Sequence, residues 1–315
     1  MQLLTTYPEG IHAIESGYLR EQLAAIHVIV SDDALAIVDT GNNDTAPRVM
    51  SVLAELGYRP EQVTYVLLTH IHLDHAGGAG AFMAACPNAR LVVHPRGVRH
   101  MVDPSKLWAG TVAVYGEDDA VAKYGKIQPV AAERIIEATD GLVLDLAGRK
   151  IRVADTPGHA AHHVCYFDER TRAWFTGDTF GLSYRELDHD GRQFVFPSTT
   201  PVQFDPEALH ASIDRLMAEQ PTAMYLTHYS RVTDLPRLAS DLHRLIDAHV
   251  AIARSGADAL DHRHQIIRNG LSALMRQEAQ RQQWPVDENT LFDLFAMDLE
   301  LNAQGLEVWL DKQTA

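Results

Sequence analysis

Cysteine is nearly absent from this 315-residue chain, which contains only Cys86 and Cys165. Two cysteines cannot supply the network of disulfides that holds small secreted domains together. Cys165 also lies in a strand-like apolar run, residues 163–167, where we expect a buried and inert thiol rather than a metal ligand. The fold must therefore depend on a hydrophobic core.

Basic residues are also few, since 27 Lys and Arg stand against 42 Asp and Glu, for a net charge of −15. A protein that binds nucleic acid needs a basic track for phosphates, so we expect no nucleic-acid partner. No apolar run approaches the length of a membrane span, and the first residues show no basic region followed by an apolar stretch. We accordingly expect a cytoplasmic protein that does not bind a membrane.

Metal-binding side chains, by contrast, are concentrated in the stretch T-H-I-H-L-D-H at residues 69–75. It contains His70, His72, Asp74 and His75. Imidazole and carboxylate are the usual protein ligands of zinc and non-haem iron. An apolar β-branched run precedes the stretch and a glycine-rich turn follows it, so these side chains should lie on a strand-to-helix loop.

Three later turns carry one further candidate ligand each. His159 ends T-P-G-H after an apolar strand, Asp178 lies in T-G-D-T after another, and His228 closes Y-L-T-H after a third. Four strands in succession thus end in a turn with a metal-binding side chain. This repetition predicts a metal site at one edge of a sheet.

The remaining pattern predicts an α/β fold followed by helices. We expect strands over residues 11–14, 25–30, 34–39, 63–68, 142–145, 151–154, 164–168 and 173–176, and helices over 45–56 and 206–219. Two long connections, 99–130 and 181–200, interrupt this plan, and the first should be helical. Both either form lids or pocket walls or pack against the core. Beyond residue 235 the spacing is helical over 235–253, 257–281 and 289–310.

The order H-x-H-x-D-H, H, D, H resembles the metallo-β-lactamase fold superfamily over residues 10–235, with H-L-D-H-A-G-G and T-P-G-H closest to its glyoxalase II-like and lactonase-like hydrolases. The resemblance implies a four-layer αβ/βα sandwich, with residues 1–235 as the catalytic domain and 236–315 as a helical C-terminal extension. Asp39, in A-I-V-D-T-G, would support the site without binding metal. The tail would help to wall the substrate pocket, form a homodimer interface, or simply cap the domain.

The same resemblance implies two divalent metal ions, with zinc preferred and iron or manganese as alternatives. His70, His72 and His159 would hold one ion, Asp74, His75 and His228 the other, and Asp178 would bridge them. A metal-bridging hydroxide would attack the acyl carbon, so Asp74 and Asp178 are catalytic as well as metal-binding.

Other polar side chains near the motifs are harder to assign. Tyr184 is the first candidate for a catalytic donor to the oxyanion and Tyr229 the second, although a wall or core role fits either equally well. His162 or His163 should support the ligand loop by a hydrogen bond. His94 lies next to Pro95 at a strand end, where a structural role is favoured over a site role. The remaining histidines have no spacing that indicates a site, and we expect ordinary polar roles for them: His12, His27, His100, His189, His210, His243, His249, His262 and His264.

Three functions fit these observations. The first is a dinuclear hydrolase that cleaves a small-molecule carboxylic ester, lactone or thioester. The second is a mononuclear iron persulfide dioxygenase, in which only His70, His159 and Asp178 would hold the ion. The third is a non-catalytic signalling effector of the same fold. The ligand set lacks the cysteine of the best-known lactam-cleaving members, which disfavours antibiotic hydrolysis.

Overall fold

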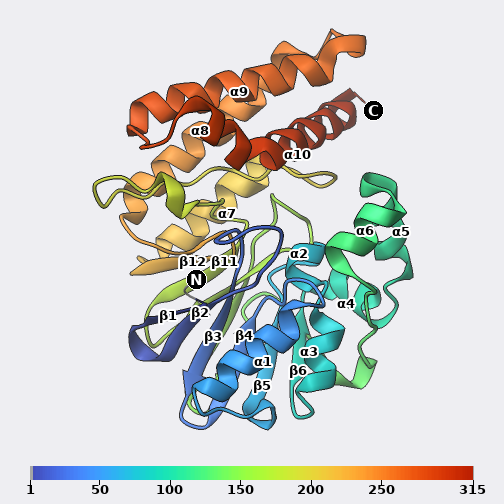
Figure 1. The fold of residues 1–315 in the computed structure, drawn as a ribbon, viewed down its shortest axis with the longest axis vertical. Coiled ribbons are helices and arrows are strands. Elements are labelled where there is room, and N and C mark those ends of the chain that lie inside the picture. The colour runs from blue at the N-terminus through green and yellow to red at the C-terminus, as the bar shows by residue number, and fades with distance from the viewer. Residues whose placement is uncertain (1–2, 315) are drawn as a thin grey trace. The chain divides into compact units, whose positions relative to one another are not determined.

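The computed structural model describes residues 3–314 (Figure 1). The chain divides into two compact units. The first comprises residues 1–155, 162–177 and 221–231, and the second comprises residues 156–161, 178–220 and 232–315. The expected domain boundary near residue 235 stays a prediction, because these units are discontinuous in sequence.

The first sheet has seven strands that follow one another in chain order. Its first four strands pair in antiparallel fashion, and from the fourth to the seventh the pairing is parallel. The strands are β1 (Leu4–Tyr7), β2 (Ile11–Glu15), β3 (Ala25–Ser31), β4 (Ala34–Val38), β5 (Val63–Leu67), β6 (Arg90–Val93) and β7 (Ile135–Glu137).

The second sheet has six strands in the order β13-β12-β11-β10-β9-β8. Strands β8 to β11 form an antiparallel meander, and β12 joins β11 in parallel. The strands are β8 (Val143–Leu146), β9 (Arg149–Asp155), β10 (Val164–Asp168), β11 (Ala173–Gly177), β12 (Ala223–Leu226) and β13 (Ser230–Val232).

Strand β4 shows why the two sheets pack face to face. All residues of Leu35–Val38 are buried, which matches a strand covered on both faces. Side chains alternate along a strand, so Ala36 and Val38 face the second sheet while Leu35 and Ile37 face the helices. One hydrophobic core therefore lies between the sheets and another between the first sheet and its helices.

The helices of the first unit lie along the outer face of the first sheet and on its β6 side (Figure 1). They are α1 (Thr45–Glu55), α2 (Leu73–Ala76), α3 (Ala79–Ala85), α4 (Pro95–Val102), α5 (Ser105–Tyr115) and α6 (Glu117–Tyr124). The helix expected at 45–56 is present, and Gly57, with φ of +85°, follows its end as anticipated. The long connection 99–130 is helical, as expected.

The buried side chain of Arg149 joins the two sheets. Arg149 on β9 donates two hydrogen bonds to Asp168 on β10, at 2.8 and 2.6 Å. Its remaining nitrogen donates to the carbonyls of Glu9 and Val30, of which Val30 belongs to β3 in the first sheet. Burial alone would raise the pKa of the Asp168 carboxyl, but the bonds from Arg149 and Thr171 hold that pKa below its usual value.

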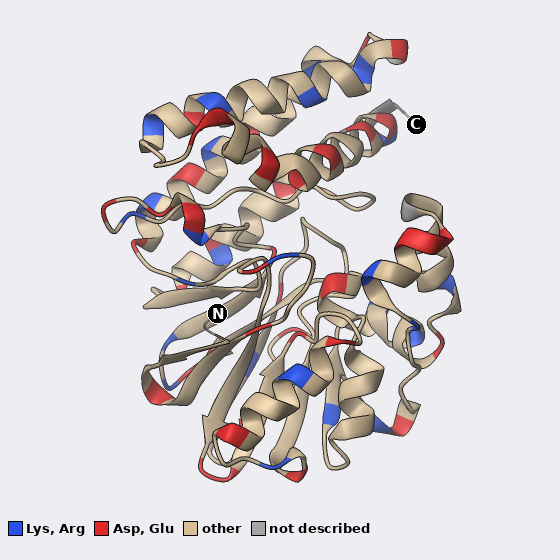
Figure 2. Ribbon diagram, in the orientation of Figure 1, with Lys and Arg blue, Asp and Glu red and all other residues tan. Residues whose placement is uncertain are grey.

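The second unit is built from helices and irregular segments. It contains α7 (Pro206–Ala218), α8 (Leu235–Ser255), α9 (Arg263–Gln282) and α10 (Glu288–Thr314). In Figure 2 charged residues recur along α8, α9 and α10, and ion pairs between Arg268 and Glu300 and between Arg263 and Asp311 join α9 to α10. Over the described residues, no helix is sufficiently long and apolar to span a bilayer.

Two elements differ from the sequence-based expectation. The helix expected to start at residue 257 begins at Arg263, after a short 3₁₀ turn at Leu260–His262. The glycine-rich segment after the motif was expected to lead into a short helix, yet α2 already begins within the motif, at Leu73. Asp74 and His75 therefore lie on a helical turn rather than on an extended loop.

Candidate metal centre

The side chain of Asp39 accepts hydrogen bonds from several residues that carry or adjoin the candidate ligands of the first unit. The residue follows β4, is fully buried, and adopts a positive φ of 59°. Its Oδ1 accepts hydrogen bonds from the Thr69 amide and hydroxyl, at 2.9 and 3.0 Å. Its Oδ2 accepts from His75 Nδ1 at 2.8 Å and from the Thr227 hydroxyl at 2.6 Å. One carboxylate thereby fixes two strand ends and the orientation of one histidine ring, in the supporting role that the sequence indicated.

Asp74, His75 and His228 come together in the first unit, with ligand atoms within 4.8 Å of one another. Asp74 Oδ2 lies 3.6 Å from His75 Nε2 and 3.3 Å from His228 Nε2. His228 Nδ1 donates to the carbonyl of Leu23 at 2.7 Å, just as His75 Nδ1 donates to Asp39. Because both Nδ1 protons are engaged, each ring presents an Nε2 lone pair towards Asp74.

This donor chemistry fits a divalent metal ion. Metal-binding histidines almost always donate the other ring N–H to a carboxylate or a backbone carbonyl, which sets the tautomer and the ring orientation. His75 and His228 each satisfy that condition with a buried partner. The arrangement can hold an ion by two neutral imidazoles and one carboxylate.

His70 and His72 form a second pair of nitrogen donors at the end of β5. His70 is fully buried, and its Nε2 lies 2.9 Å from His72 Nδ1. The Thr69 hydroxyl gives its proton to Asp39, so at 3.2 Å it accepts the Nδ1 proton of His70. The facing nitrogens of His70 and His72 are therefore close enough to bind one cation together.

His163 packs against one member of this pair. Its ring is fully buried and stacks on the ring of His70, with centroids 4.8 Å apart and planes inclined by 23°. A side chain at Gly177, where φ is +47°, would come within 2.7 Å of His163 Nε2 and 2.6 Å of Thr69 Oγ1. Glycine is therefore required at the end of β11. His162 lies farther out, with its ring centroid 5.7 Å from that of His72.

The second unit brings its own two candidate ligands together. His159 and Asp178 are both buried, and His159 Nε2 lies 3.6 Å from Asp178 Oδ2. His159 Nδ1 donates to the carbonyl of Ser198 at 3.1 Å, so this ring has the same tautomer as His75 and His228. The second unit thus repeats the pattern of an anchored imidazole beside a carboxylate.

A close approach to α7 holds the turn that carries His159. At Gly158 φ is +134°, and a side chain there would lie 2.3 Å from the Cα of Leu209. The amide of Asp205 donates to the Gly158 carbonyl, and Ser212 donates to the carbonyl of Pro157 at 2.6 Å. The T-P-G-H turn is therefore clamped on the first turns of a helix, which restricts the position of the imidazole.

The two tyrosines proposed as oxyanion donors are engaged in packing. Tyr184 is fully buried, and its hydroxyl donates to Asp298 on α10 at 2.7 Å. A phenol has one proton, so that proton is already used. Tyr229 is 7% exposed and packs against Ala13 and Ala25. A catalytic role for either tyrosine stays a prediction, and the geometry favours the structural role.

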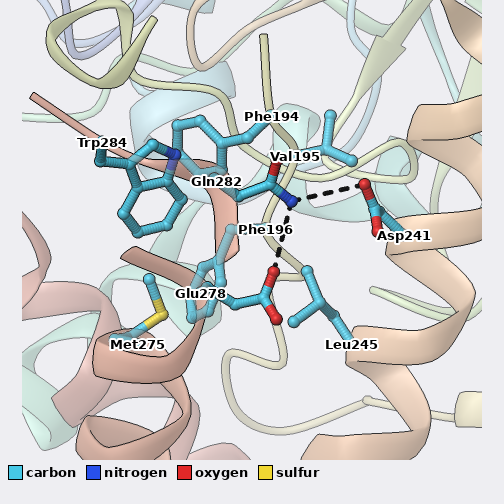
Figure 3. A pocket seen from close by; sticks show the side chains of 9 residues that line it. All are labelled: Phe194, Val195, Phe196, Asp241, Leu245, Met275, Glu278, Gln282 and Trp284. Atoms are coloured by element: carbon cyan, nitrogen blue, oxygen red, sulfur yellow. Dashed lines mark hydrogen bonds between the residues drawn. The ribbon is translucent and has the colours of Figure 1, made fainter. Parts of the chain in front are cut away.

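The tail encloses a small pocket in the second unit, shown in Figure 3. Gln282 points into it and donates to Asp241 and Glu278, at 3.5 and 3.4 Å. Its volume is about 10 Å³, room for roughly one water molecule, whereas small-molecule sites usually span several hundred. This pocket is a gap in the packing and not a substrate site. The other lining residues are Phe194, Val195, Phe196, Leu245, Met275 and Trp284.

Burial changes the protonation of several groups away from the ligands. It lowers the pKa of both His27 and His249 to about 4, although Asp39 partly offsets this at His27. It raises the pKa of the Cys86 thiol to about 11. Both cysteines are buried and lie outside any disulfide, and the burial of Cys165 agrees with the packing role expected for it.

Comparison with known proteins identifies the family. The profile of the metallo-beta-lactamase superfamily matches residues 21–228, which is about two thirds of the chain. The chain belongs to this superfamily. The expected fold class, a sandwich of this superfamily with a helical C-terminal extension, is confirmed.

Among curated proteins, a metallo-beta-lactamase fold-containing protein of Sulfurisphaera tokodaii is 25% identical over 70% of this chain and 78% of its own length. An atrochrysone carboxyl ACP thioesterase of Aspergillus fumigatus is 31% identical over 41% of this chain. A hydroxyacylglutathione hydrolase of Roseobacter denitrificans is 28% identical over 50% of it. These last two matches cover only 30% and 51% of the relatives' own lengths.

Solved structures of the superfamily show the same fold. An archaeal superfamily protein from Sulfolobus tokodaii aligns over 95% of this chain and 99% of its own, with a TM-score of 0.65 and 21% identity. A family protein from Thermus thermophilus aligns over 97% and 94%, with the same TM-score and 20% identity. The relatives therefore support a metal-binding hydrolase in general and leave the bond undefined.

Proposed function

We propose that this superfamily member is a dinuclear, metal-dependent hydrolase that cleaves a small carboxylic ester, lactone or thioester. The observation that carries the proposal is the group of Asp74, His75 and His228 in the first unit. Both histidines direct Nε2 at one carboxylate while buried acceptors hold their Nδ1 protons. That construction is expected of ligands and has no purpose in simple packing.

We assign one ion to His70, His72 and His159 and the other to Asp74, His75 and His228, with Asp178 bridging the two. Neutral imidazoles and carboxylates suit zinc, and iron or manganese can occupy such sites too. Two such ions would supply an activated water at neutral pH and positive charge for the developing oxyanion.

The protein's own contribution is to fix its donors in place. The Nδ1 bonds of His75, His159 and His228 prevent their rings from turning. The stacking of His163 does the same for His70. Because little side-chain motion is left to lose, the geometry required for attack on an acyl carbon is held before substrate arrives.

Thioesters are the first bond class to examine. Two relatives are named as a thioesterase and a hydroxyacylglutathione hydrolase, both of which act on acyl–sulfur bonds by their names. The net charge of −15 does not favour anionic substrates at long range, although bound divalent ions would make the site locally positive. An acyl thioester with a negative charge near the carbonyl is therefore compatible with the proposal.

A persulfide dioxygenase is the second candidate, because His70, His159 and Asp178 would suffice for its single iron ion. The Asp74 group supports the hydrolase, because it completes a second set of anchored candidate ligands. By the family resemblance these residues also persist in the dioxygenases, so the choice is made by experiment. Oxygen consumption with a persulfide substrate would favour the dioxygenase.

The decisive experiment measures proton release in weak buffer by zinc-loaded and chelated protein. The panel contains a thioester, a lactone, a carboxylic ester and a phosphoester. We expect metal-dependent acid release from one acyl class, abolished in His228→Ala and retained in His262→Gln, which alters an exposed histidine. Activity that survives in His228→Ala would overturn the dinuclear assignment. No release from any substrate would turn attention to oxygen consumption and then to a non-catalytic effector role.

A further inference from the structure

Two histidines on neighbouring helices of the second unit, neither of them among the ligands described above, meet head-on. His210 lies on α7 and His243 on α8, and the Nδ1 atoms of the two rings are 2.6 Å apart. The ring planes differ by only 16° and the centroids lie 4.9 Å apart. That spacing arises when two nearly coplanar rings point their Nδ1 corners at each other.

Carboxylates hold the far side of each ring in a crossed arrangement. His210 Nε2 lies 3.2 Å from Asp247 on α8, and His243 Nε2 lies 3.1 Å from Asp214 on α7. Each helix therefore carries the same H-x-x-x-D pattern, H-A-S-I-D at 210–214 and H-R-L-I-D at 243–247, and each aspartate binds the histidine of the other helix.

These contacts determine where the protons are. An ionised carboxylate can only accept a hydrogen bond, so the Nε2 atom of each ring carries the N–H. In the neutral rings both Nδ1 atoms are then acceptors, and two lone pairs face each other at 2.6 Å. Such a contact is repulsive unless a cation lies between the nitrogens.

We propose that His210 and His243 form a second metal site, which binds one late first-row ion such as Cu²⁺ or Zn²⁺ between their Nδ1 atoms and links α7 to α8. Each ring satisfies the usual condition for a metal-binding histidine, because its other N–H is given to a carboxylate. The two aspartates also balance the charge of a divalent ion. The site is separate from the proposed hydrolase centre and does not depend on it.

The dimensions and exposure of the pair suit such an ion. Two nitrogens bound at about 2.0–2.1 Å to a tetrahedral ion lie roughly 3.3 Å apart, so the rings must separate by about 0.7 Å from their present contact and tilt so that both lone pairs point at the ion. The side chains are 28% and 27% exposed, which leaves room for that movement and for water as the remaining ligands. Copper is the strongest probe, because it heads the affinity order for nitrogen ligands.

The test is equilibrium dialysis of the full chain against Cu²⁺, followed by metal analysis and electron paramagnetic resonance. Wild-type protein should bind one ion more per chain than His243→Gln, with a signal from two nitrogen ligands. Asp214→Asn should weaken the binding of that ion about tenfold or more, because the neutral amide accepts the His243 proton more weakly and no longer balances the charge of the ion. The matched control, His262→Gln, should bind as many ions as the wild type.

Repeating the comparison in a His70→Ala/His228→Ala background separates this site from the hydrolase centre. The difference of one ion should persist there. Equal copper content in wild type and His243→Gln, with both proteins folded by circular dichroism, would overturn the proposal. The pair would then be held by a shared proton alone.

Discussion

Around Asp39 every interacting side chain is buried, whereas in the Arg268–Glu300 ion pair, which joins α9 to α10, both side chains are exposed. Asp39 is 0% exposed and accepts bonds from Thr69, His75 and Thr227. Arg268 and Glu300, by contrast, are 38% and 41% exposed. A buried carboxylate therefore contributes much more to the free energy of unfolding than an exposed one. Removal of the buried group leaves its hydrogen-bond donors unsatisfied, whereas water replaces the exposed group.

The largest effect is expected from Asp39→Ala. The change leaves several buried donors without their acceptor, so the free energy of unfolding should fall by roughly 3–5 kcal/mol. It also releases the His75 ring, so metal affinity should fall at least 10- to 100-fold. Urea denaturation and metal content after dialysis measure the two effects. Asp258→Ala, at an exposed carboxylate, is the control, and unchanged metal content in Asp39→Ala would refute the role of Asp39.

Acidification should lower the free energy of unfolding through two buried histidines. The pKa of His27 on β3 and of His249 on α8 is lowered to about 4 by burial. Below pH 6.5 the unfolded chain takes up protons that the folded chain refuses, so stability is lost as the pH falls from about 6.5 towards 4. Each histidine contributes up to roughly 1.4 kcal/mol per pH unit.

The variant His249→Gln tests how much His249 contributes to this pH dependence of stability. Gln can still donate to the Leu245 carbonyl, which now accepts from His249 Nδ1 at 2.7 Å. Unfolding curves recorded between pH 7 and pH 4 should show a shallower slope than those of the wild type. An unaltered slope would mean that His249 is protonated in the folded protein.

Tyr184→Phe is expected to have a smaller effect. It removes the hydroxyl that donates to buried Asp298, so the free energy of unfolding should fall by roughly 1–2 kcal/mol. Once a substrate is known, turnover should stay unchanged, because the phenol proton is not directed at the reaction. A loss of turnover with unchanged affinity would instead restore Tyr184 as an oxyanion donor.

The smallest effect is expected from Arg268→Gln. Its pair with Glu300 is exposed on both sides, so stability should change by no more than about 0.5 kcal/mol, and less at high salt. Arg244→Gln provides the contrast within the tail, because Glu278 is only 6% exposed and accepts two bonds from Arg244. Thermal unfolding of the two variants side by side should rank Arg244→Gln as clearly the more damaging.

Sequence reasoning was strongest where a motif coincided with a strand end. The strand before His70 was predictable, because an apolar β-branched run is a local feature. The supporting place of Asp39 was implied by the family resemblance. Strand β1, L-T-T-Y, was missed since half of its residues are threonine and its partner β2 supplies most of its stability. The three-residue β7 is too short to show any period.

The pairing of a histidine on α7 with one on α8 could not be predicted from the sequence. His210 and His243 are 33 residues apart, and nothing local indicates that their helices lie side by side. Their equal H-x-x-x-D patterns gain meaning only once packing places them opposite each other. The hydrogen bond of the Tyr184 hydroxyl could not be predicted from the sequence either, because its acceptor, Asp298, is 114 residues away.

The hydrogen bonds of Asp39 also bear on how the protein matures. Its partners Thr69 and Thr227 are 158 residues apart, so the carboxylate is satisfied only after distant segments of the chain have come together. Once it is, His75 is already in the form that accepts an ion. We therefore expect the folded chain, and not the unfolded one, to take up the proposed ions. In that case the metal carried by the protein would depend on the supply at the moment of loading as well as on the ligands.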